Sequence, residues 1–314
     1  MEEKKQNVAA VVVTFNRLEL LKKCIQSLRE QTRKLDGIIV VNNNSTDGTL
    51  DWLNSQDDLT VITQENSGSA GGQYTGIKTA YEKGYDWILT FEDELRAEPN
   101  LIQMLVENIN RKIAGIACVR INQDTKNYVL SDIIKFNEKA IKDSKRYQKI
   151  TESSLNSNSI KIFAASFEGL LLNRLAIQKI GLPKKEFFIW YDDIEYCRRL
   201  NRFGPIYLIP SAKIFKISNN DERSFINSHY AKMLYGLRNY TYLENRFNPS
   251  SKRYTLIKYL SIFLKFLNIH RFYVLNFNEI NIKIIKHFNL SVKAVSDGVK
   301  GKFCRYSLGV ISSE

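Results

Sequence analysis

The 314-residue sequence predicts an α/β fold, with a mostly parallel central sheet flanked by helices and with a helical C-terminal extension. Short runs rich in Val and Ile alternate with amphipathic segments over residues 8–120, which is the pattern of β-α-β units. A polar cluster follows each of these runs, and ligands of parallel sheets bind beyond the carboxyl ends of the strands. The same pattern therefore predicts a ligand site at one edge of the sheet.

Four segments have the β-branched composition of buried parallel strands. They are Val8–Phe15, Gly37–Asn43, Leu59–Thr63 and Asp86–Phe91. Three helices are expected between them, over Arg17–Gln31, Ser45–Ser55 and Ala70–Gly84. The first helix has its leucines on one face, the second opens with a Ser/Thr/Asp capping cluster, and the third ends at a glycine. Strands and helices in this order imply right-handed crossovers.

The rest of the chain contains a polar insertion, a second core-like part and a basic helical part. Residues 122–159 are rich in Lys, Asn and Ser and are expected to form an insertion with some strand or helix. Core-like sequence returns at Ile160–Pro183 and Glu186–Gly204, and helical patterns follow at Ser228–Phe247 and Arg253–Leu275. We therefore expect an α/β domain in residues 1–220 and a mainly helical region in residues 221–314.

The net charge of +13 is distributed unevenly. From Arg223 onward, Lys and Arg far outnumber the acids, which are Glu244, Glu279, Asp297 and Glu314. A basic region interleaved with aromatic and aliphatic residues can lie on an anionic membrane surface. Helices that pack on the α/β domain with solvated basic faces would give the same pattern. Nucleic acid is disfavoured as a partner, because no recognised binding motif accompanies the charge.

The sequence favours a cytoplasmic location, with peripheral attachment to the inner face of the plasma membrane through the basic region. The four cysteines are scattered without a C-x-x-C pair, as expected of reduced thiols and not of disulfides or a metal site. No run of about 18 apolar residues indicates a transmembrane helix. The charged N-terminus lacks the apolar region of a secretory signal.

The segment WILTFEDELRAEP leads from a predicted strand directly into three adjacent carboxylates, Glu92, Asp93 and Glu94. Adjacent carboxylates repel one another unless a cation or a substrate compensates their charge. A solvated acidic turn would explain an isolated triplet of this kind. The polar clusters that follow the other strands, at residues 14–17, 42–47 and 66–72, indicate instead that the triplet belongs to the predicted ligand site.

Six sequence motifs follow one another between Val8 and about Tyr240. They are VVVTFNRLELLKKCIQSLREQT, IIVVNNNSTDGT, ENSGSAGGQYTGI, WILTFEDELRAEP, FFIWYDDIEYCRRL and LYGLRNY. Together they resemble the inverting family 2 glycosyltransferases with the GT-A fold, and within them the branch of bacterial galactofuranosyl- and rhamnosyltransferases. The resemblance implies a nucleoside diphosphate sugar as donor, with UDP and dTDP as the leading carriers.

The resemblance also implies a metal site at the acidic triplet, where the family has an Asp-x-Asp type motif. Glu92 and Glu94 would bind Mn²⁺ or Mg²⁺ through hard oxygen ligands, and Asp93 would lie at the donor. Glutamate in place of aspartate puts the metal preference in question. The family often has a histidine ligand further along the chain, and Lys216 stands roughly at that place, where it could offset diphosphate charge directly. His229 is not assigned as a ligand.

Other parts of the donor site follow from the same resemblance. The implied residues are Thr14, Asn16, Arg17, Asn43, Gly71, Gly72 and Asp93. Thr14 and Asn43 match positions that contact the base, and an amide can pair with uracil or thymine. The glycines allow the backbone to approach a diphosphate at a helix N-terminus. Asn42 stands where the family often has Asp, and Asp47 is expected to cap the helix that follows it.

Asp192 and Asp193 resemble the catalytic acidic pair of the family. By that match Asp193 is the general base that deprotonates the acceptor hydroxyl, and Asp192 orients the acceptor or supports Asp193. A helix N-cap is the alternative explanation of an Asp-Asp pair. Trp190, Tyr191 and Arg238 are expected at the acceptor, the two aromatic rings as an apolar platform for a sugar. Plain core aromatics and a surface arginine remain alternatives.

The sequence therefore predicts a glycosyltransferase that moves galactofuranose or rhamnose from a UDP- or dTDP-sugar, with inversion, to a glycan on a lipid carrier. The product would be part of a cell-surface polysaccharide. Two other kinds of protein are compatible with parts of the pattern. A nucleotide-sugar-binding protein with impaired catalysis would explain the Glu-Asp-Glu variant, and a basic nucleic-acid-binding protein would explain the charge alone.

Overall fold

The computed structural model describes residues 6–109, 112–136, 147–217, 225–247, 290 and 292–305. The expected helical segment Arg253–Leu275 lies outside these residues. The chain divides into two compact units. The first comprises Met1–Phe188 and Asp192–Asn220, and the second comprises Ile189–Tyr191 and Asp221–Glu314.

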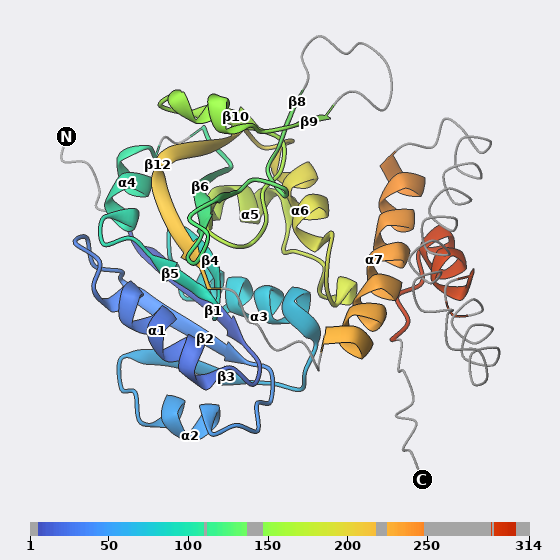
Figure 1. The fold of residues 1–314 in the computed structure, drawn as a ribbon, viewed down its shortest axis with the longest axis horizontal. Coiled ribbons are helices and arrows are strands. Elements are labelled where there is room, and N and C mark those ends of the chain that lie inside the picture. The colour runs from blue at the N-terminus through green and yellow to red at the C-terminus, as the bar shows by residue number, and fades with distance from the viewer. Residues whose placement is uncertain are drawn as a thin grey trace. The chain divides into compact units, whose positions relative to one another are not determined.

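Ten strands of the described residues form one sheet in the first unit, in the order β10-β12-β6-β11-β4-β1-β2-β3, with β5 beside β12 and β7 beside β6 (Figure 1). They are β1 (Val8–Thr14), β2 (Gly37–Asn42), β3 (Leu59–Thr63), β4 (Trp87–Glu92), β5 (Leu95–Ala97), β6 (Gly115–Asn122), β7 (Tyr128–Val129), β10 (Ile160–Ile162), β11 (Leu170–Asn173) and β12 (Ile206–Lys216). The strands β8 (Ile134–Phe136) and β9 (Tyr147–Lys149) form a separate pair.

The expected parallel arrangement is present in one half of the sheet, where β1 pairs in parallel with β2 and β4, and β2 with β3. The other half is mixed. Strand β11 runs antiparallel to both β4 and β6, whereas β6 and β12 are parallel to each other. Because β11 is reversed between them, β4 and β6 run in the same direction. The carboxyl ends of β1, β2, β3 and β4 therefore lie at the same edge as those of β6 and β12.

Helices cover both faces of the sheet (Figure 1). In the first unit they are α1 (Leu18–Arg29), α2 (Thr49–Asn54), α3 (Gly68–Glu82), α4 (Leu101–Glu107), α5 (Arg174–Ile180) and α6 (Asp192–Leu200), with the 3₁₀ turns η1 (Glu152–Asn156) and η2 (Lys185–Phe187). Successive side chains of β1 point to opposite faces of the sheet and join different helix layers. Val8, Ala10 and Val12 pack with α1, α2 and α4, whereas Ala9 and Val11 pack with α3, α5 and α6.

Helix α3 lies directly on β1 because glycines occupy its contact face. A Cβ atom at Gly76 would overlap the side chain of Val11, and one at Gly72 would overlap Val13. The apolar contact is continued by Ile77 and Ala80, which are fully buried. The glycine-rich sequence of this helix is therefore required for packing, whatever it contributes to ligand binding.

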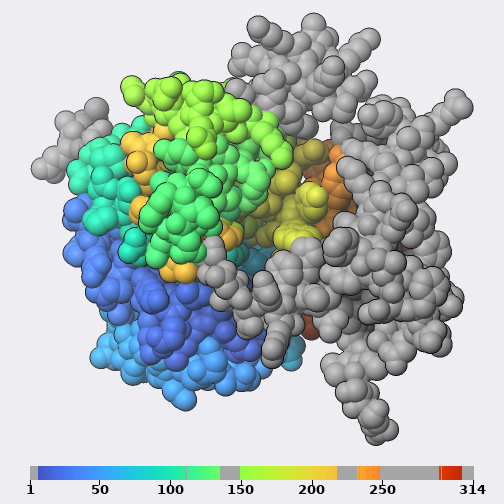
Figure 2. Space-filling view, viewed as in Figure 1, coloured from blue at the N-terminus to red at the C-terminus, as the bar shows by residue number. Residues whose placement is uncertain are grey.

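The polar segment that follows β6 is an insertion on the surface of the first unit. It contains β7, β8, β9 and η1, and most of its described residues between Asn122 and Ser131 are exposed or half-buried. In the space-filling view it forms the green part of the visible face, above the blue N-terminal helices (Figure 2). Its exposure agrees with its Lys-, Asn- and Ser-rich composition.

The second unit is organised around α7 (Phe225–Phe247), with a further helical segment at residues 292–300. Leu234, Tyr235 and Leu243 of α7 are buried, as is Ala294 of the second segment. Gly298 allows the two to approach, because a Cβ atom there would overlap the carbonyl oxygen of Arg238. In the described part of the chain, no helix has the length and hydrophobicity needed to cross a membrane.

Candidate active site

The carboxyl edge of the sheet brings together residues that are far apart in the sequence. Strand pairing places Thr14 of β1 opposite Asn42 of β2, and Val13 opposite Glu92 of β4. At the end of the mixed half, Lys216 of β12 lies opposite Asn122 of β6. The reversed strand β11 contributes its amino end to the same edge. Five strand ends and the loop before β11 therefore lie along one edge, as expected for the ligand site of such a sheet.

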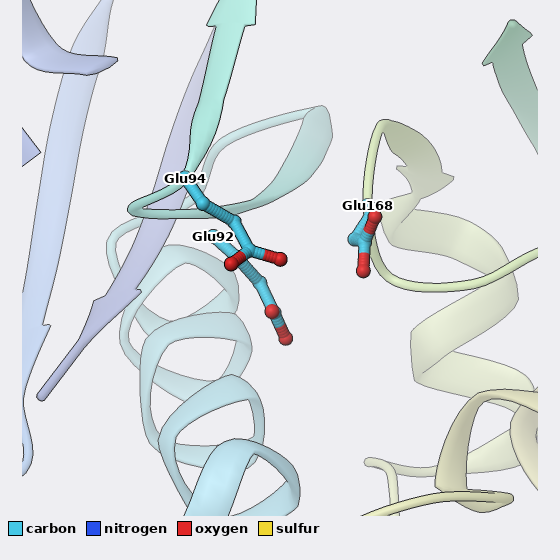
Figure 3. A group of neighbouring side chains, drawn as sticks. All are labelled: Glu92, Glu94 and Glu168. Atoms are coloured by element: carbon cyan, nitrogen blue, oxygen red, sulfur yellow. The ribbon is translucent and has the colours of Figure 1, made fainter. Parts of the chain in front are cut away.

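Three carboxylates converge at this edge. One oxygen each of Glu92, Glu94 and Glu168 lies within 4.8 Å of the others. Figure 3 shows Glu92 and Glu94 at the end of β4 and Glu168 in the loop that leads into β11, with the three side chains directed toward one another. Carboxylate oxygens are the ligands that Mg²⁺ and Mn²⁺ prefer. The donor set therefore fits a divalent cation.

The middle carboxylate of the triplet, Asp93, turns away from this group toward the loop after β1. Its Oδ2 atom accepts a hydrogen bond of 2.9 Å from Thr14 Oγ1, and its Oδ1 atom lies 3.1 Å from Arg17 Nη1. The same guanidinium nitrogen lies 2.8 Å from Glu94 Oε2. Asp93 is 3% exposed, so its charge needs these partners. Thr14 and Arg17 thus form one cluster with the acidic triplet.

Lys216 lies between Glu94 and Glu168. Its Nζ atom is 2.7 Å from Glu94 Oε1 and 2.9 Å from Glu168 Oε1. Glu168 also forms an ion pair with Arg120, which is buried and whose other guanidinium nitrogen lies 2.6 Å from Asp132 Oδ2. Burial raises the pKa of Glu168, but Arg120 and Lys216 outweigh this effect and lower it overall. Glu168 is therefore held as a carboxylate.

Glu92 lacks a cationic partner of this kind among the described residues. Ser69 Oγ donates a hydrogen bond of 2.6 Å to its Oε1 atom. Burial, together with the negative charges of Glu168 and Glu94, raises the pKa of Glu92 to about 7. The edge thus carries more negative charge than Arg17 and Lys216 neutralise, and a bound cation would restore the balance. Such a cation would share Glu94 and Glu168 with Lys216.

The remaining residues expected at the donor make contacts within the protein. Asn16 has a φ of 53° and connects two loops, because its Oδ1 atom accepts a hydrogen bond of 2.7 Å from Thr46 N. Asn43 is buried, and its amide joins Gly68 O at 3.1 Å and Gln64 Nε2 at 2.8 Å. These bonds hold the amino end of α3 against β2. They leave the Asn43 amide directed into the protein.

The glycines before and within α3 are closely surrounded. A Cβ atom at Gly71 would overlap the side chain of Ser67, and one at Gly68 would overlap the carbonyl oxygen of Phe188. Gly68 also has a φ of 73°, a conformation that L side chains rarely adopt. Ala70 N donates a hydrogen bond of 3.1 Å to Phe188 O. The amino end of α3 therefore supports the segment that leads to the acidic pair.

Asn42, at the end of β2, and Asp47, in the loop after it, also make contacts within the protein. Asp47 accepts hydrogen bonds from Leu18 N at 3.0 Å and from Thr49 N at 3.2 Å, so it caps α1 as well as the start of α2. Asn42 is fully buried, and its Oδ1 atom accepts a bond from Ser45 N at 2.9 Å. Its Nδ2 atom has no hydrogen-bond partner in the described part of the chain.

Asp192 and Asp193 form the first turn of α6. Burial raises the pKa of Asp192 to about 6, an effect partly offset by hydrogen bonds from backbone N–H groups of the pair. Burial and the neighbouring Asp192 raise the pKa of Asp193 well above its ordinary value. Asp193 Oδ1 accepts a hydrogen bond of 2.7 Å from Ile194 N, the next residue in the first turn of α6. The negative charge of Asp132 and the positive charge of Arg120 also act on Asp193.

The backbone that leads into this pair is strained. Phe188, Trp190 and Tyr191 have φ values of 66°, 63° and 68°. Residues of this size rarely adopt positive φ, and each instance costs about 1–3 kcal/mol. Trp190 is 40% exposed, as an aromatic platform requires. Arg238, expected at the acceptor, is instead buried within the second unit, which favours a structural role for it.

The main residue that sequence reasoning missed is Glu168. It lies in an otherwise apolar run, SFEGLLLN, directly before Gly169, which has a φ of 87°. A lone carboxylate directly before a buried strand could have indicated a site residue. Its place beside β4, however, follows from the reversed direction of β11, which the sequence does not indicate. Arg120 of β6 and Asp132 of the insertion were also missed, because only the tertiary structure brings Arg120 to Asp132 and to Glu168.

The raised pKa of Asp193 predicts a stability effect. Between the ordinary pKa of an aspartate and the higher folded-state value, the unfolded chain releases the proton first, so the folded protein loses stability as the pH rises. Asp193→Asn removes this cost. We expect its melting temperature to exceed that of the wild type by about 2–4 °C at pH 8 and by less at pH 5.

Differential scanning calorimetry at both pH values measures this difference. Asp57→Asn, at an exposed aspartate in the loop before β3, is the matched control and should shift the melting temperature equally at both. An unchanged or lowered melting temperature of Asp193→Asn at pH 8 would contradict the prediction.

Comparison with known proteins agrees with this geometry. Residues 9–171 match the family model described as Glycosyl transferase family 2. The chain is 29% identical over 215 residues to dTDP-rhamnosyl transferase RfbF of Shigella flexneri, covering 66% of this chain and 68% of that protein. It is 28% identical over 203 residues to Galactofuranosyltransferase GlfT1 of Mycolicibacterium smegmatis, covering 63% of this chain and 66% of that protein. The alignments thus span about two thirds of these relatives.

The fold is also similar to a solved structure, the crystal structure of GalNAc-T7 with UDP, GalNAc and Mn²⁺. The TM-score is 0.58 at 13% sequence identity, and the match covers 78% of this chain and 48% of that chain. The likeness concerns the fold and supports the expected GT-A architecture. Since the family model covers more than half of the 314 residues, the chain belongs to glycosyl transferase family 2 and is a glycosyltransferase with the GT-A fold.

Proposed function

We propose that this glycosyltransferase moves rhamnose or galactofuranose from a dTDP- or UDP-sugar, with inversion, to a lipid-linked glycan of a cell-surface polysaccharide. The observation that carries the proposal is the convergence of Glu92, Glu94 and Glu168 within 4.8 Å at the carboxyl edge of the sheet. The relatives named a dTDP-rhamnosyl transferase and a galactofuranosyltransferase support the two candidate sugars.

The three glutamates are proposed to hold Mn²⁺ or Mg²⁺. The GalNAc-T7 structure, which has a similar fold, contains Mn²⁺ together with UDP, and this supports a cation at the same edge here. When bound, the ion would offset negative charge that develops on the leaving diphosphate. Lys216, which contacts Glu94 and Glu168, adds positive charge on the same side. Glutamates with a lysine would then do what aspartates with a histidine do in related enzymes.

The donor is proposed to lie along the ends of β1, β2 and β4. Arg17 is the residue best placed to meet its diphosphate, since its side chain is 32% exposed while it contacts Asp93 and Glu94. Thr14 supports Asp93 through its hydroxyl hydrogen bond. Asn16, Asn43, Gly71 and Gly72 are proposed to shape the nucleotide side, mainly by holding the loops and α3 in position.

Asp193 is proposed as the general base. Its carboxylate accepts the proton of the acceptor hydroxyl as that oxygen forms a bond to the anomeric carbon, on the face opposite the diphosphate. The bond to the diphosphate breaks and its electron pair leaves with the nucleotide. A raised pKa makes Asp193 a stronger base once deprotonated. Asp192 is proposed to orient the acceptor, with Trp190 and Tyr191 as the platform for a sugar ring.

The metal proposal predicts that Mn²⁺ in the presence of UDP or dTDP raises the melting temperature, since a ligand that binds the folded state stabilises it. Glu168→Gln should abolish most of this rise, and Glu92→Gln and Glu94→Gln should reduce it. Glu107→Gln, at an exposed glutamate of α4, should leave it intact. Transfer at the full rate in excess EDTA would contradict a role for the cation.

The base proposal predicts that Asp193→Asn lowers the rate of sugar transfer by about 10²–10⁴-fold while nucleotide affinity changes little. Transfer from dTDP-rhamnose and UDP-galactofuranose to lipid-linked glycans measures the rate, and calorimetry with dTDP or UDP measures the affinity. Because the base must be deprotonated, wild-type kcat should fall as the pH drops through a pKa above the ordinary aspartate range. Wild-type rates for Asp193→Asn, or a wild type that binds nucleotide without transfer, would contradict the assignment.

We further propose that the basic C-terminal region meets an anionic membrane surface, where a lipid-linked acceptor resides. Most of this region lies outside the described residues, so the support is the charge pattern alone. The protein should co-sediment with vesicles that contain anionic lipid, and salt should release it because exposed charges are screened. Equal binding to neutral and anionic vesicles, or binding to neither, would contradict this proposal.

A further inference from the structure

The segment Ile189–Tyr191 belongs to the second unit, and one side chain of α7 forms hydrogen bonds to its backbone. Asn239 Nδ2 donates to the carbonyl oxygens of both Ile189 and Trp190, each at 2.9 Å. Asn239 is fully buried, so water does not compete for these bonds. A single amide group therefore satisfies two consecutive carbonyls of a strained segment.

The neighbouring residue fixes the orientation of that amide. Arg238 Nε donates a hydrogen bond of 2.9 Å to Asn239 Oδ1, so the Asn239 NH₂ group is the part that faces the segment. Arg238 is itself anchored, because its Nη1 donates to Cys304 O at 2.7 Å and its guanidinium lies 5.1 Å from the ring centres of Tyr235 and Phe303. The Arg-Asn pair thus forms a rigid support within the second unit.

The aromatic side chains of the segment also lie on α7. A Cβ atom at Gly236 would be 2.6 Å from Cε3 of Trp190, so only glycine permits the indole to rest there. The ring of Tyr191 lies 5.7 Å from that of Tyr240. One turn of α7, residues 236–240, therefore contacts the segment through a glycine, an amide and an aromatic ring.

The strained segment is joined directly to the acidic pair, since Tyr191 is followed by Asp192 and Asp193. Positive φ values at Trp190 and Tyr191 persist only where the surroundings impose them. We propose that Asn239 is a positioning residue, which acts through the Ile189–Tyr191 backbone to fix the direction in which the chain enters α6 and thereby the placement of Asp193. This inference rests on the proposed role of Asp193 as the base.

The same helix contains a control for the loss of an asparagine side chain away from the segment. Asn245 lies on the same helix, and its Nδ2 atom donates to Val299 O, also at 2.9 Å. Its partner is far in sequence from the acidic pair. Replacing Asn245, which is exposed, by alanine removes one side chain-to-backbone bond of α7 without touching the segment.

The test compares Asn239→Ala with Asn245→Ala in the full-length protein. We expect Asn239→Ala to lower kcat by about 10²-fold, because a misplaced catalytic group costs that much, while the donor KM stays within about twofold. The acid limb of its pH–kcat profile should also move, since the surroundings of Asp193 change. Asn245→Ala should keep the wild-type kcat and profile. Gly236→Ala, which disturbs only the Trp190 contact, should lower kcat less.

Hydrogen exchange of the backbone amides from 188 to 193 provides a readout that does not need activity. Exchange should accelerate in Asn239→Ala and remain as in the wild type in Asn245→Ala. Equal kcat in the two variants, or unchanged exchange in Asn239→Ala, would overturn the inference. A wild type without transfer activity would overturn the proposed function instead, and the exchange result would still decide whether Asn239 holds the segment.

Discussion

The arrangement of the active edge depends on the compensation of crowded carboxylates by cations of the same chain. Buried charges are unfavourable unless they are paired. Each cation here pairs with two acids. Arg17, after β1, pairs with the adjacent Asp93 and Glu94, whereas Lys216 joins Glu94 to Glu168 and Arg120 joins Glu168 to Asp132. The loops after β1 and β4, the loop before β11 and the end of β12 are therefore fixed by one electrostatic network. Among the described residues of this network, Glu92 differs from the other acids. It accepts a hydrogen bond from the Ser69 hydroxyl instead of forming an ion pair, and its pKa is raised.

Much of the parallel half of the fold could be predicted from the sequence, because its strands are uniform β-branched runs separated by helices with clear caps. The mixed half could not, since the direction of β11 is set by pairing on both sides and not by any local pattern. The same difference applies to the site. Glu92 and Glu94 adjoin a predicted strand, whereas Glu168 depends on the reversed strand. Lys216 was noticed by its position, but its two ion pairs required the tertiary structure.

Several residues expected at the donor have contacts that sequence motifs do not reveal. Asn43 and Gly72 match nucleotide-binding positions, yet they join β2 and β1 to α3. Asp47 caps two helices, although only one was expected. A residue that matches a binding motif can therefore serve the packing of the loop that carries the site. The Arg-Asn pair of α7 is a second case, because both side chains are buried.

The partial exposure of Trp190 has a practical consequence. The chain has three tryptophans, of which Trp87 is buried in β4 and Trp52 packs against the core from α2. Trp190 alone belongs to the segment that adjoins the acidic pair. Its indole fluorescence therefore provides an intrinsic optical signal of that segment, and a Trp52→Phe background would leave the buried Trp87 as a constant reference. Changes in the surroundings of this segment can then be followed in real time without an added label.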